Sequence, residues 1–144
     1  ISGLGVKVIE THRYKPPTCG GGTYFATGNI ISPIFDTGAT NGVGYNWLMA
    51  SGTTPIGTKI RIQLATADAD AGPWSYIGPD CTDASYYYNS VLPASSQPQE
   101  IKCYSNHNNK RYFRYKTIIC SSDDCATPGN DTPIINDVIV NWSP

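Results

Sequence analysis

Hydrophobic and polar residues alternate most regularly between Thr58 and Thr66. The apolar positions are Ile60, Ile62 and Leu64, and the polar positions between them are Lys59, Arg61 and Gln63. Consecutive side chains of a strand point to opposite faces, so we expect the apolar set in a core and the polar set facing solvent or a neighbouring subunit. The pattern predicts a strand of an antiparallel sheet that is solvated on one face.

Shorter apolar stretches, separated by Gly, Pro, Asn and Asp, continue along the rest of the chain. They predict strands over 4–10, 23–35, 45–50, 58–66, 74–77, 85–88, 100–103, 112–119 and 134–142. Many short strands with turn signals between them are typical of antiparallel β-sandwiches and jelly rolls. We therefore expect an all-β fold, with an N-terminal strand and Pro/Gly-rich linker over 1–22 and a β-sandwich domain over 23–144.

The composition narrows the class of protein. The chain has 144 residues, of which 40% are hydrophobic, and this suits one domain with a hydrophobic core. Charged residues make up 15% and the formal net charge is -1, so there is no electrostatic basis for expecting nucleic acid or an anionic membrane surface as a partner. We find no apolar run that would insert the globular part into a membrane and no signal peptide. Because the first residue is Ile1 and not Met, we expect a processed or trimmed chain.

Five cysteines suggest disulfide bonds and hence an oxidising compartment. Cys120 and Cys125 enclose a short polar loop, and Cys81 and Cys103 flank a longer polar stretch that contains proline. We expect these two pairs to be bridged, the alternative being free buried thiols. Cys19, in Thr-Cys-Gly-Gly-Gly, is either free or takes a partner from one of the pairs. The spacing is too loose for a zinc site.

The stretch Pro33-Ile-Phe-Asp-Thr-Gly-Ala-Thr40 spells the active-site loop of an aspartic protease. Such an enzyme needs two carboxylates that share a proton, and this chain has one copy of the motif, so a symmetric dimer would have to supply the second. The alternative is that Asp36 orders a turn by accepting hydrogen bonds from backbone N–H groups. His12 and His107 are isolated, and we expect both to be solvent-facing loop residues and not a catalytic base or a metal ligand.

Two further sets of residues are candidates for binding. Asp68 and Asp70 could hold Ca²⁺ together with backbone carbonyls, although two carboxylates in a hairpin turn are more often plain turn formers. Trp74, with Tyr86 and Tyr88, could form a platform that stacks on sugar rings. The alternative for the tyrosines is burial at one edge, since consecutive strand residues cannot all share a surface.

A basic strand gives one more candidate surface. In 110–116, Arg114 and Lys116 alternate with Phe113 and Tyr115, which predicts one solvated basic face and one core face. We first interpret Arg114 and Lys116 as a solvated strand face. The alternative is a partner surface, to which Lys59 and Arg61 of the alternating strand would also belong.

Five segments, taken in order with Trp47, resemble a known family. They are 31–38, 55–66, 71–79, 108–116 and 132–144. Together they resemble the C-terminal extracellular β-sandwich module of prepilin-like, type IV pilin-related surface proteins of uncultured, small-genome bacteria, over roughly residues 23 to 144. The resemblance implies that Phe-Asp-Thr-Gly is the exit of a strand, and it supplies no catalytic residues.

One departure from that family concerns the N-terminus. Pilin-like proteins begin with a long apolar helix that anchors the subunit and builds the filament core, and Ile1-Ser-Gly-Leu-Gly-Val is not such a helix. Either that helix was removed or this chain assembles differently. The strand over 6–10 would then pair with its own sheet or be donated to the edge of a neighbour.

Taken together, the sequence predicts a non-catalytic extracellular structural subunit, or a surface-exposed head, of a pilus-like filament on a bacterial cell surface. It would act through protein–protein contacts with filament neighbours, as a homo-oligomer, and would need no cofactor. The alternative is a carbohydrate-binding or adhesin module with a glycan as partner. An aspartic protease using Asp36 is the remote alternative.

Overall fold

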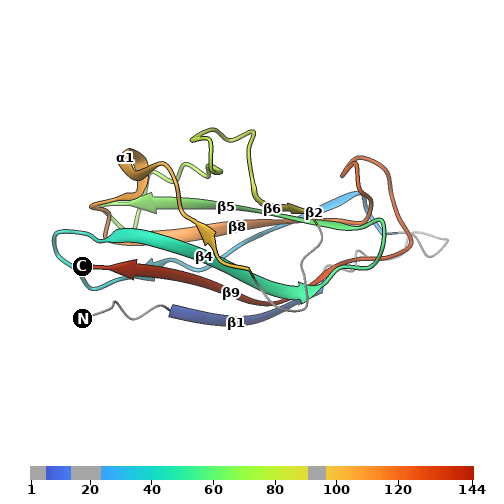
Figure 1. Ribbon diagram of the computed structural model, residues 1–144, viewed down its shortest axis with the longest axis horizontal. Helices are drawn as coiled ribbons and strands as arrows, with labels where there is room; N and C mark the ends of the chain where they lie inside the picture. The colour runs from blue at the N-terminus through green and yellow to red at the C-terminus, as the bar shows by residue number, and fades with distance from the viewer. Residues whose placement is uncertain (1–5, 14–23, 91–96) are drawn as a thin grey trace.

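The computed structural model describes residues 6–13, 24–90 and 97–144, and for 6–13 and Ser90 it describes the backbone. The chain forms strands β1 (Val6–Arg13), β2 (Thr27–Ile31), β3 (Phe35–Asp36), β4 (Gly44–Thr53), β5 (Lys59–Ala67), β6 (Tyr87–Ser90), β7 (Gln99–Glu100), β8 (Tyr112–Cys120) and β9 (Ile134–Ser143), and one short helix, α1 (Tyr104–His107). The strands run along the long axis of the molecule in two layers (Figure 1).

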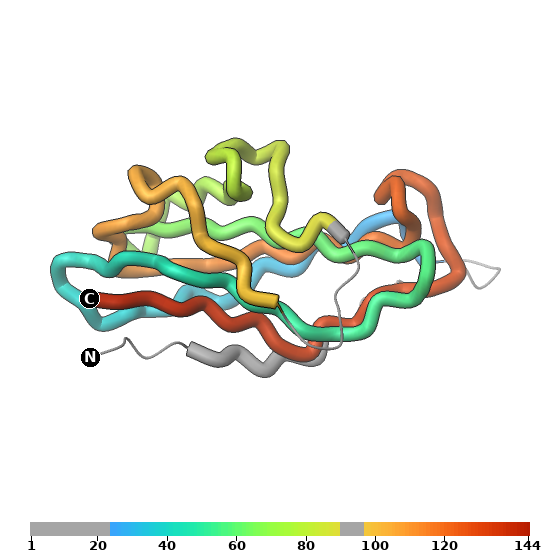
Figure 2. The backbone as a smooth tube through the Cα atoms, viewed as in Figure 1, coloured from blue at the N-terminus to red at the C-terminus, as the bar shows by residue number. Residues whose placement is uncertain are grey.

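Each layer is an antiparallel sheet. One sheet has the strand order β1-β9-β4-β7, and the other has the order β2-β8-β5-β6, with β3 also paired to β8. The chain crosses from one sheet to the other at several turns. The turn after β4 can be followed in green in Figure 2. This arrangement confirms the predicted disulfide-stabilised all-β fold of the sandwich type.

The core lies between the inner faces of the two sheets. It contains Tyr45, Leu48, Ala50, Ile60, Ile62, Leu64, Ile101, Phe113, Tyr115, Ile119, Ile135, Val138, Val140 and Trp142. Towards one end the packing is aromatic, since the Phe113 ring stacks on Phe35 with centroids 4.9 Å apart and meets Tyr45 edge-on at 5.8 Å. Alternate residues of four long strands thus supply one continuous apolar layer.

The alternation in β5 is confirmed on its apolar side. Ile60, Ile62 and Leu64 are each 0% exposed. The prediction for Gln63 is wrong, because this side chain is 1% exposed and donates from Nε2 to the backbone oxygens of Asp83 (2.8 Å) and Ser85 (3.0 Å). The loop before β6 lies over Gln63, so an outward-pointing residue is covered by a segment twenty positions later.

Local backbone conformation modifies several predicted strands. The predicted strand over 23–35 is interrupted at Pro33, and β2 and β3 lie on either side of the break. The predicted return strand over 74–77 is reduced to one bridge, between Ile77 and Leu64. The four-residue helix α1 was not predicted, and it follows Cys103, whose φ of 66° turns the chain sharply.

The N-terminal strand belongs to the sandwich. β1 pairs with β9 in antiparallel register, with Val6 opposite Val140 and Arg13 opposite Ile134. Of the two alternatives for this strand, the structure has it in the sheet of its own chain. Cys19 and the proposed boundary between residues 22 and 23 lie outside the described residues.

Both predicted disulfides are confirmed. Cys81 is bonded to Cys103, with Cα atoms 5.4 Å apart, and Cys120 is bonded to Cys125, with Cα atoms 4.9 Å apart. The first bridge ties the loop before β6 to the segment that leads into α1. Both of these segments stand above β5 in Figure 1.

Candidate functional site

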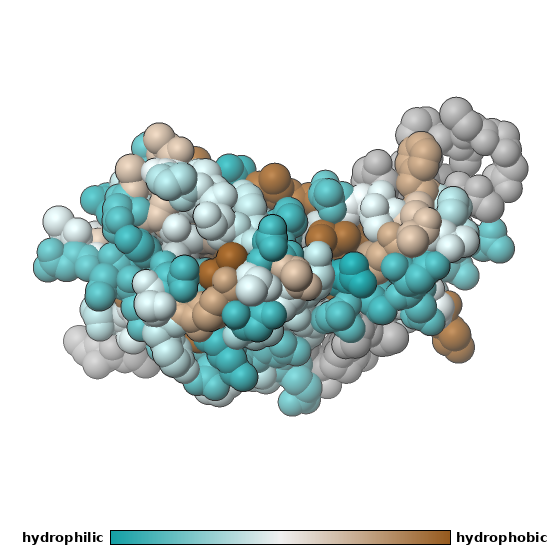
Figure 3. Space-filling view, turned by 90° about the horizontal axis from the view of Figure 1, so that it is seen from above, coloured by the Kyte–Doolittle hydropathy of each residue, from teal (hydrophilic) through white to brown (hydrophobic). Residues whose placement is uncertain are grey.

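The residues singled out from the sequence meet on the outer face of the β2-β8-β5-β6 sheet. In the register of β5 and β8, Lys59 lies opposite Cys120, Gln63 opposite Lys116, and Ala65 opposite Arg114. Residues that lie opposite each other share a face. Lys59, Arg61, Arg114 and Lys116 therefore point out on one side, as predicted, and each is half-buried. Seen from above in Figure 3, this side of the molecule is mainly hydrophilic, with small separate hydrophobic spots.

Aromatic rings from the segment after β5 lie against these cations. The guanidinium carbon of Arg61 is 4.9 Å from the centroid of the Tyr86 ring, and that of Arg114 is 5.6 Å from the Trp74 ring. The ammonium of Lys116 is 5.5 Å from the centroid of Tyr76. Three cation–aromatic pairs thus lie on one face, and such contacts hold the charged heads by the attraction of the ring quadrupole. We call this set of six residues the cation–aromatic face.

The small residues of β5 make these contacts possible. The segment with Trp74 and Tyr76 runs on one side of β5, where Ile77 bridges to Leu64, and β8 runs on the other side. The Trp74–Arg114 contact therefore crosses the outer face of β5. Ala65 and Ala67, which are 0% and 3% exposed, are the β5 residues there. A large side chain at Ala65 would stand in the way of this contact.

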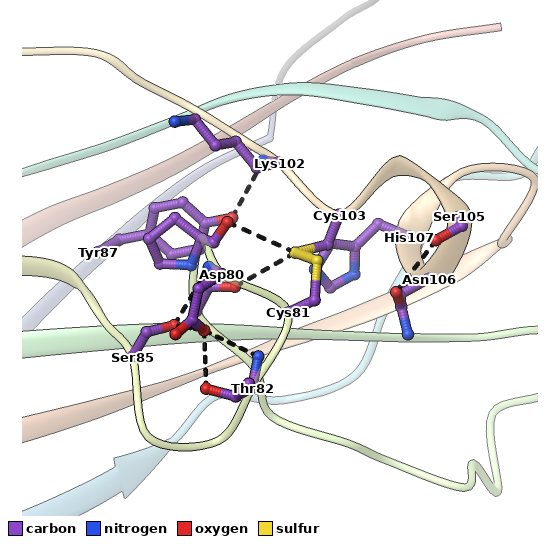
Figure 4. The surroundings of a disulfide bond; sticks show 12 residues. Asp80, Cys81, Thr82, Ser85, Tyr87, Lys102, Cys103, Ser105, Asn106 and His107 are labelled. Atoms are coloured by element: carbon purple, nitrogen blue, oxygen red, sulfur yellow. Dashed lines mark hydrogen bonds between the residues drawn. A yellow bond between two sulfur atoms is a disulfide. The ribbon is translucent and has the colours of Figure 1, made fainter.

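The loop between Ile77 and β6 is compact, which fixes where Tyr86 lies. Gly78 donates its N–H to the carbonyl of Thr82, and a Cβ at Gly78 would lie 2.2 Å from the backbone of Ser85. The Asp80 carboxylate accepts hydrogen bonds from the N–H and the hydroxyl of Thr82 and from the hydroxyl of Ser85 (Figure 4). These bonds hold the pKa of Asp80 below its usual range.

The two arginines of the cation–aromatic face are held in place on one side of the guanidinium. The Nε of Arg61 donates to the side-chain oxygen of Asn89 (2.8 Å), and the Nε of Arg114 donates to the backbone oxygen of Ser32 (2.9 Å). Within the described residues, no carboxylate forms an ion pair with Lys59, Arg61, Arg114 or Lys116. The terminal nitrogens of both arginines thus remain available as donors.

Tyr88 does not belong to this surface, which corrects the prediction. It is 4% exposed, and its hydroxyl donates towards the backbone oxygens of Leu48 and Gln97 and accepts from the N–H of Ala50. The reason is its φ of 55°, a left-handed conformation that breaks the alternation of the strand. Tyr87 and Tyr88 are consequently both buried, and Tyr86 alone stays at the surface.

Tyr76 was missed by the sequence interpretation. The signal was its position two residues after Trp74, since residues two apart share a face of an extended segment. That spacing alone does not identify a partner for Tyr76. Lys116 follows it by forty positions in the chain, and only the pairing of β5 with β8 brings the two together.

Asp36 orders a turn, which was the alternative to the protease interpretation of its sequence motif. Its Oδ1 accepts the N–H of Gly38 at 2.8 Å, and both carboxylate oxygens accept from the guanidinium of Arg111 at 2.8 Å. The Arg111 hydrogen bonds and the Gly38 bond lower the pKa of Asp36 to about 2. A catalytic dyad must instead share a proton near working pH. The observed contacts are those of a residue that orders a turn.

The two weak calcium candidates differ in their contacts. The Asp68 carboxylate accepts from the ammonium of Lys110 at 2.6 Å, and Asp70 is exposed in the same turn. Over the described residues, no group of three or more His, Cys, Asp or Glu side chains could hold a metal ion.

His107 was predicted to face solvent, and this prediction is wrong. Its ring is 1% exposed, with Nδ1 3.1 Å from the hydroxyl of Thr66, while Nε2 has no hydrogen-bond partner within the described residues. It lines a hollow of about 290 Å³ beside Lys110 and Asp68. Because burial disfavours the charged imidazolium, the pKa of His107 falls to about 4.

We expect acidification to destabilise the protein through His107. In the unfolded chain the imidazole binds a proton near pH 6.5, whereas in the folded protein it stays neutral until about pH 4. Above pH 6.5 the neutral ring contributes its full stabilisation. This contribution falls as the pH drops from 6.5 to about 4, and below about pH 4 it falls no further. The full loss is roughly 3 kcal/mol.

Urea unfolding at a series of pH values measures this effect, and the control is His107→Gln, which cannot titrate. The variant should lose the dependence between pH 6.5 and 4 while keeping any dependence below pH 4, where Asp36 titrates. Equal slopes for the two proteins in the upper window would show that His107 is not the residue responsible.

The outer face of the other sheet carries a shallow apolar hollow. It measures about 400 Å³ and is lined by Trp47, Met49, Pro98, Ile139 and Asn141. Trp47 is 46% exposed there. None of the five described lining side chains is ionisable.

Comparisons with family models, with curated proteins and with solved structures found no match. The resemblance to pilin-like modules therefore stands on the sequence landmarks alone and stays a prediction. Within the described part of the chain, no helix has the length and apolar character needed to span a bilayer.

Proposed function

We propose that this chain is a non-catalytic structural subunit, or a surface-exposed head, of an extracellular pilus-like filament, and that it acts through contacts with neighbouring copies of itself. The observation that carries this proposal is the outer edge of strand β2. Its outward backbone groups have no partner strand among the described residues, and the segment has exposed apolar side chains and no charged residue. Edges of this kind favour pairing with another chain.

The direction of the backbone groups follows from the hydrogen bonds at either end of β2. The carbonyl of Ala26 accepts from Ser121 and the N–H of Ser32 donates to Tyr115, so even-numbered residues bond to β8. In an antiparallel pair the intervening residues point their N–H and C=O groups the other way. Thr27, Asn29 and Ile31 therefore direct these groups outward, and β2 has no second neighbouring strand among the described residues.

The side chains along this edge lack the usual protection against pairing. Residues 24 to 35 contain no Asp, Glu, Lys or Arg. Three large apolar side chains project from the segment, namely Phe25 (53% exposed), Ile31 (48%) and Ile34 (43%). By contrast, β1, at an edge of the other sheet, contains Lys7, Glu10 and Arg13 in its sequence. Charged residues at an edge are a common means of preventing association, and β2 has none.

The proposed extracellular location is supported by the two disulfides. Bonds of this kind persist in oxidising environments such as a bacterial cell surface. The absence of strong net charge, at -1, agrees with a subunit that associates through strand edges and apolar contacts.

The substitution Asn29→Pro tests this proposal. It removes one outward N–H while leaving the bonds from Gly28 and Ile30 to β8, and proline is tolerated at edge strands. We expect the dissociation constant for self-association to rise at least tenfold, which is about 1.4 kcal/mol. Sedimentation velocity over a range of concentrations measures it, with electron microscopy for filaments.

Asn29→Ala is the matched control, because it shortens the same exposed side chain and keeps the N–H. It should associate as the unmodified chain does, and both variants should unfold at nearly the same urea concentration. If the unmodified chain stays monomeric at every concentration tested, or if Asn29→Pro associates equally well, β2 is not the contact.

A carbohydrate-binding or adhesin module is the second candidate function. The observation that favours it is the gathering of Trp74, Tyr76 and Tyr86 on one face of the sheet. The two candidates are compatible, because edge pairing uses the backbone of β2 and the aromatic rings lie beyond β8 and β5.

A further inference from the structure

We propose that the cation–aromatic face binds an acidic polysaccharide, with Arg61, Arg114 and Lys116 receiving uronate carboxylates and the rings of Trp74, Tyr76 and Tyr86 contacting the sugar. This inference rests on the second candidate function and names its ligand class. It does not depend on pairing at the β2 edge.

The two arginines of this face are ordered by the protein itself. Each arginine is oriented through its Nε, to Asn89 or to Ser32, and through a ring, and its terminal nitrogens have no partner among the described residues. The planar guanidinium donates pairs of parallel hydrogen bonds to a carboxylate. Because the heads are already ordered, a ligand need not pay the entropy of fixing them.

Among the described residues, no carboxylate pairs with the cations of this face. Of the carboxylates in the neighbouring loops, Asp36 pairs with Arg111 and Asp68 with Lys110, while Asp70 and Asp83 are exposed and form no ion pair with this face within the described residues. Asp80 accepts hydrogen bonds within its own loop. A chain with net charge -1 thus has a face whose positive groups form no ion pair within the described residues. Such a face attracts an external anion.

The positive charges of this face stand at regular intervals. Residues two apart along a strand stand about 7 Å apart, and neighbouring strands are about 5 Å apart. Arg114 and Lys116 therefore form one step of a row, and Arg61 on β5 continues it diagonally. Separate positive groups at such intervals suit a ligand whose negative groups repeat, and not a single small anion.

A polysaccharide fits this face better than an acidic peptide does. β5 lies between β8 and β6, and β8 lies between β2 and β5, so the backbone groups of both strands are already paired. An extended peptide could add no main-chain bonds on this face. Side chains alone contact the ligand, and half-exposed rings with interleaved cations match the apolar C–H faces and carboxylates of linked uronates.

Binding of polygalacturonate, measured by isothermal titration calorimetry, tests the proposal. The same polymer with its carboxylates methyl-esterified is the neutral control, and poly-glutamate is the acidic peptide control. We expect the protein to bind polygalacturonate, to bind neither control comparably, and to lose affinity as salt is added. The Asn29→Pro variant should bind equally well, so that failure of the edge contact and failure of this site are distinguishable.

Substitutions locate the site. Arg114→Gln and Lys116→Gln should each weaken binding of polygalacturonate at least fivefold, and Arg114→Lys should fall between Arg114→Gln and the unmodified chain, because it keeps the charge and loses the paired donors. Lys102→Gln is the matched control for Lys116→Gln. It removes one exposed positive charge from the segment that follows β7, a strand of the other sheet, and binding should be unchanged.

Three outcomes would overturn the proposal. One is that the folded protein binds no polygalacturonate, and another is that Lys102→Gln weakens binding as much as Lys116→Gln. The third is that poly-glutamate binds as tightly and with the same sensitivity to Arg114→Gln, which would assign the face to an acidic protein partner.

Discussion

Replacing Ile62 with Asp is expected to abolish the folded state. Ile62 lies in the middle of β5, is 0% exposed and belongs to the core between the sheets. The change removes the burial of an isoleucine side chain, about 1.5–3 kcal/mol, and places a carboxylate where it has no partner, at a further cost of several kcal/mol. Their sum is comparable to the whole stability of a domain, about 5–15 kcal/mol. Circular dichroism and tryptophan fluorescence at neutral pH measure the loss.

Two controls separate burial from side-chain identity in this strand. Ile62→Val should cost only about 1 kcal/mol, because it removes one methylene. Arg61→Asp, on the opposite face and half-buried, should leave the protein folded while it changes the charge of the cation–aromatic face. A folded Ile62→Asp protein with an unchanged urea midpoint would mean that this position does not face the core.

The strands could be predicted because their side chains alternate. The apolar–polar alternation runs from Lys59 to Leu64 in β5 and from Phe113 to Lys116 in β8. Ile60, Ile62, Leu64, Phe113 and Tyr115 all lie in the core as expected. The bridges could be predicted because each pair of cysteines encloses a polar loop. In these cases the information is local, since a strand or a short loop largely determines the outcome by itself.

The errors arose where a distant segment covers a residue or a backbone angle breaks the alternation. Gln63 points outward from β5 and is nevertheless buried by residues 83–85. Tyr88 turns inward because its φ is 55°. His107 lies in a polar stretch, Asn-His-Asn-Asn, but α1 carries it into the space beside Thr66. No pattern within ten residues of any of the three indicates these contacts.

The candidate site was predictable as a set of residues and not as an arrangement. Arg61, Arg114, Lys116, Trp74 and Tyr86 were each selected as surface candidates from alternation and residue type. Which cation meets which ring depends on the register of β5 with β8 and on the path of residues 74–86. Register is a tertiary property, because it requires knowing which strands are neighbours.

Removing the Cys81–Cys103 bridge is the second large effect that we expect. The bridge closes a separation of 22 residues, and replacing both cysteines with Ala should lower the free energy of unfolding by about 3 kcal/mol on the chain-entropy estimate. Both must be replaced, because a single free thiol could exchange with Cys19 or with another cysteine. Urea unfolding of the oxidised proteins measures the difference.

The same variant should loosen the segment that carries the aromatic rings. Residues 74–88 are attached to β5 at Ile77 and Tyr87, and between these points the bridge anchors the loop to the chain that leads into α1. Amide hydrogen exchange over 74–88 should therefore become faster in the double Ala variant. Affinity for polygalacturonate should fall with it, since the rings would no longer hold Arg61 and Arg114 in place.

The control is the corresponding double replacement of Cys120 and Cys125. That bridge closes a separation of only 5 residues, so about 2 kcal/mol is expected. It joins the last residue of β8 to the turn that follows, so exchange over 74–88 should stay unchanged. If removing Cys81–Cys103 leaves exchange over 74–88 as slow as before, the strand contacts of Ile77 and Tyr87 suffice to order the segment. The bridge would then stabilise the protein only by restricting the unfolded chain.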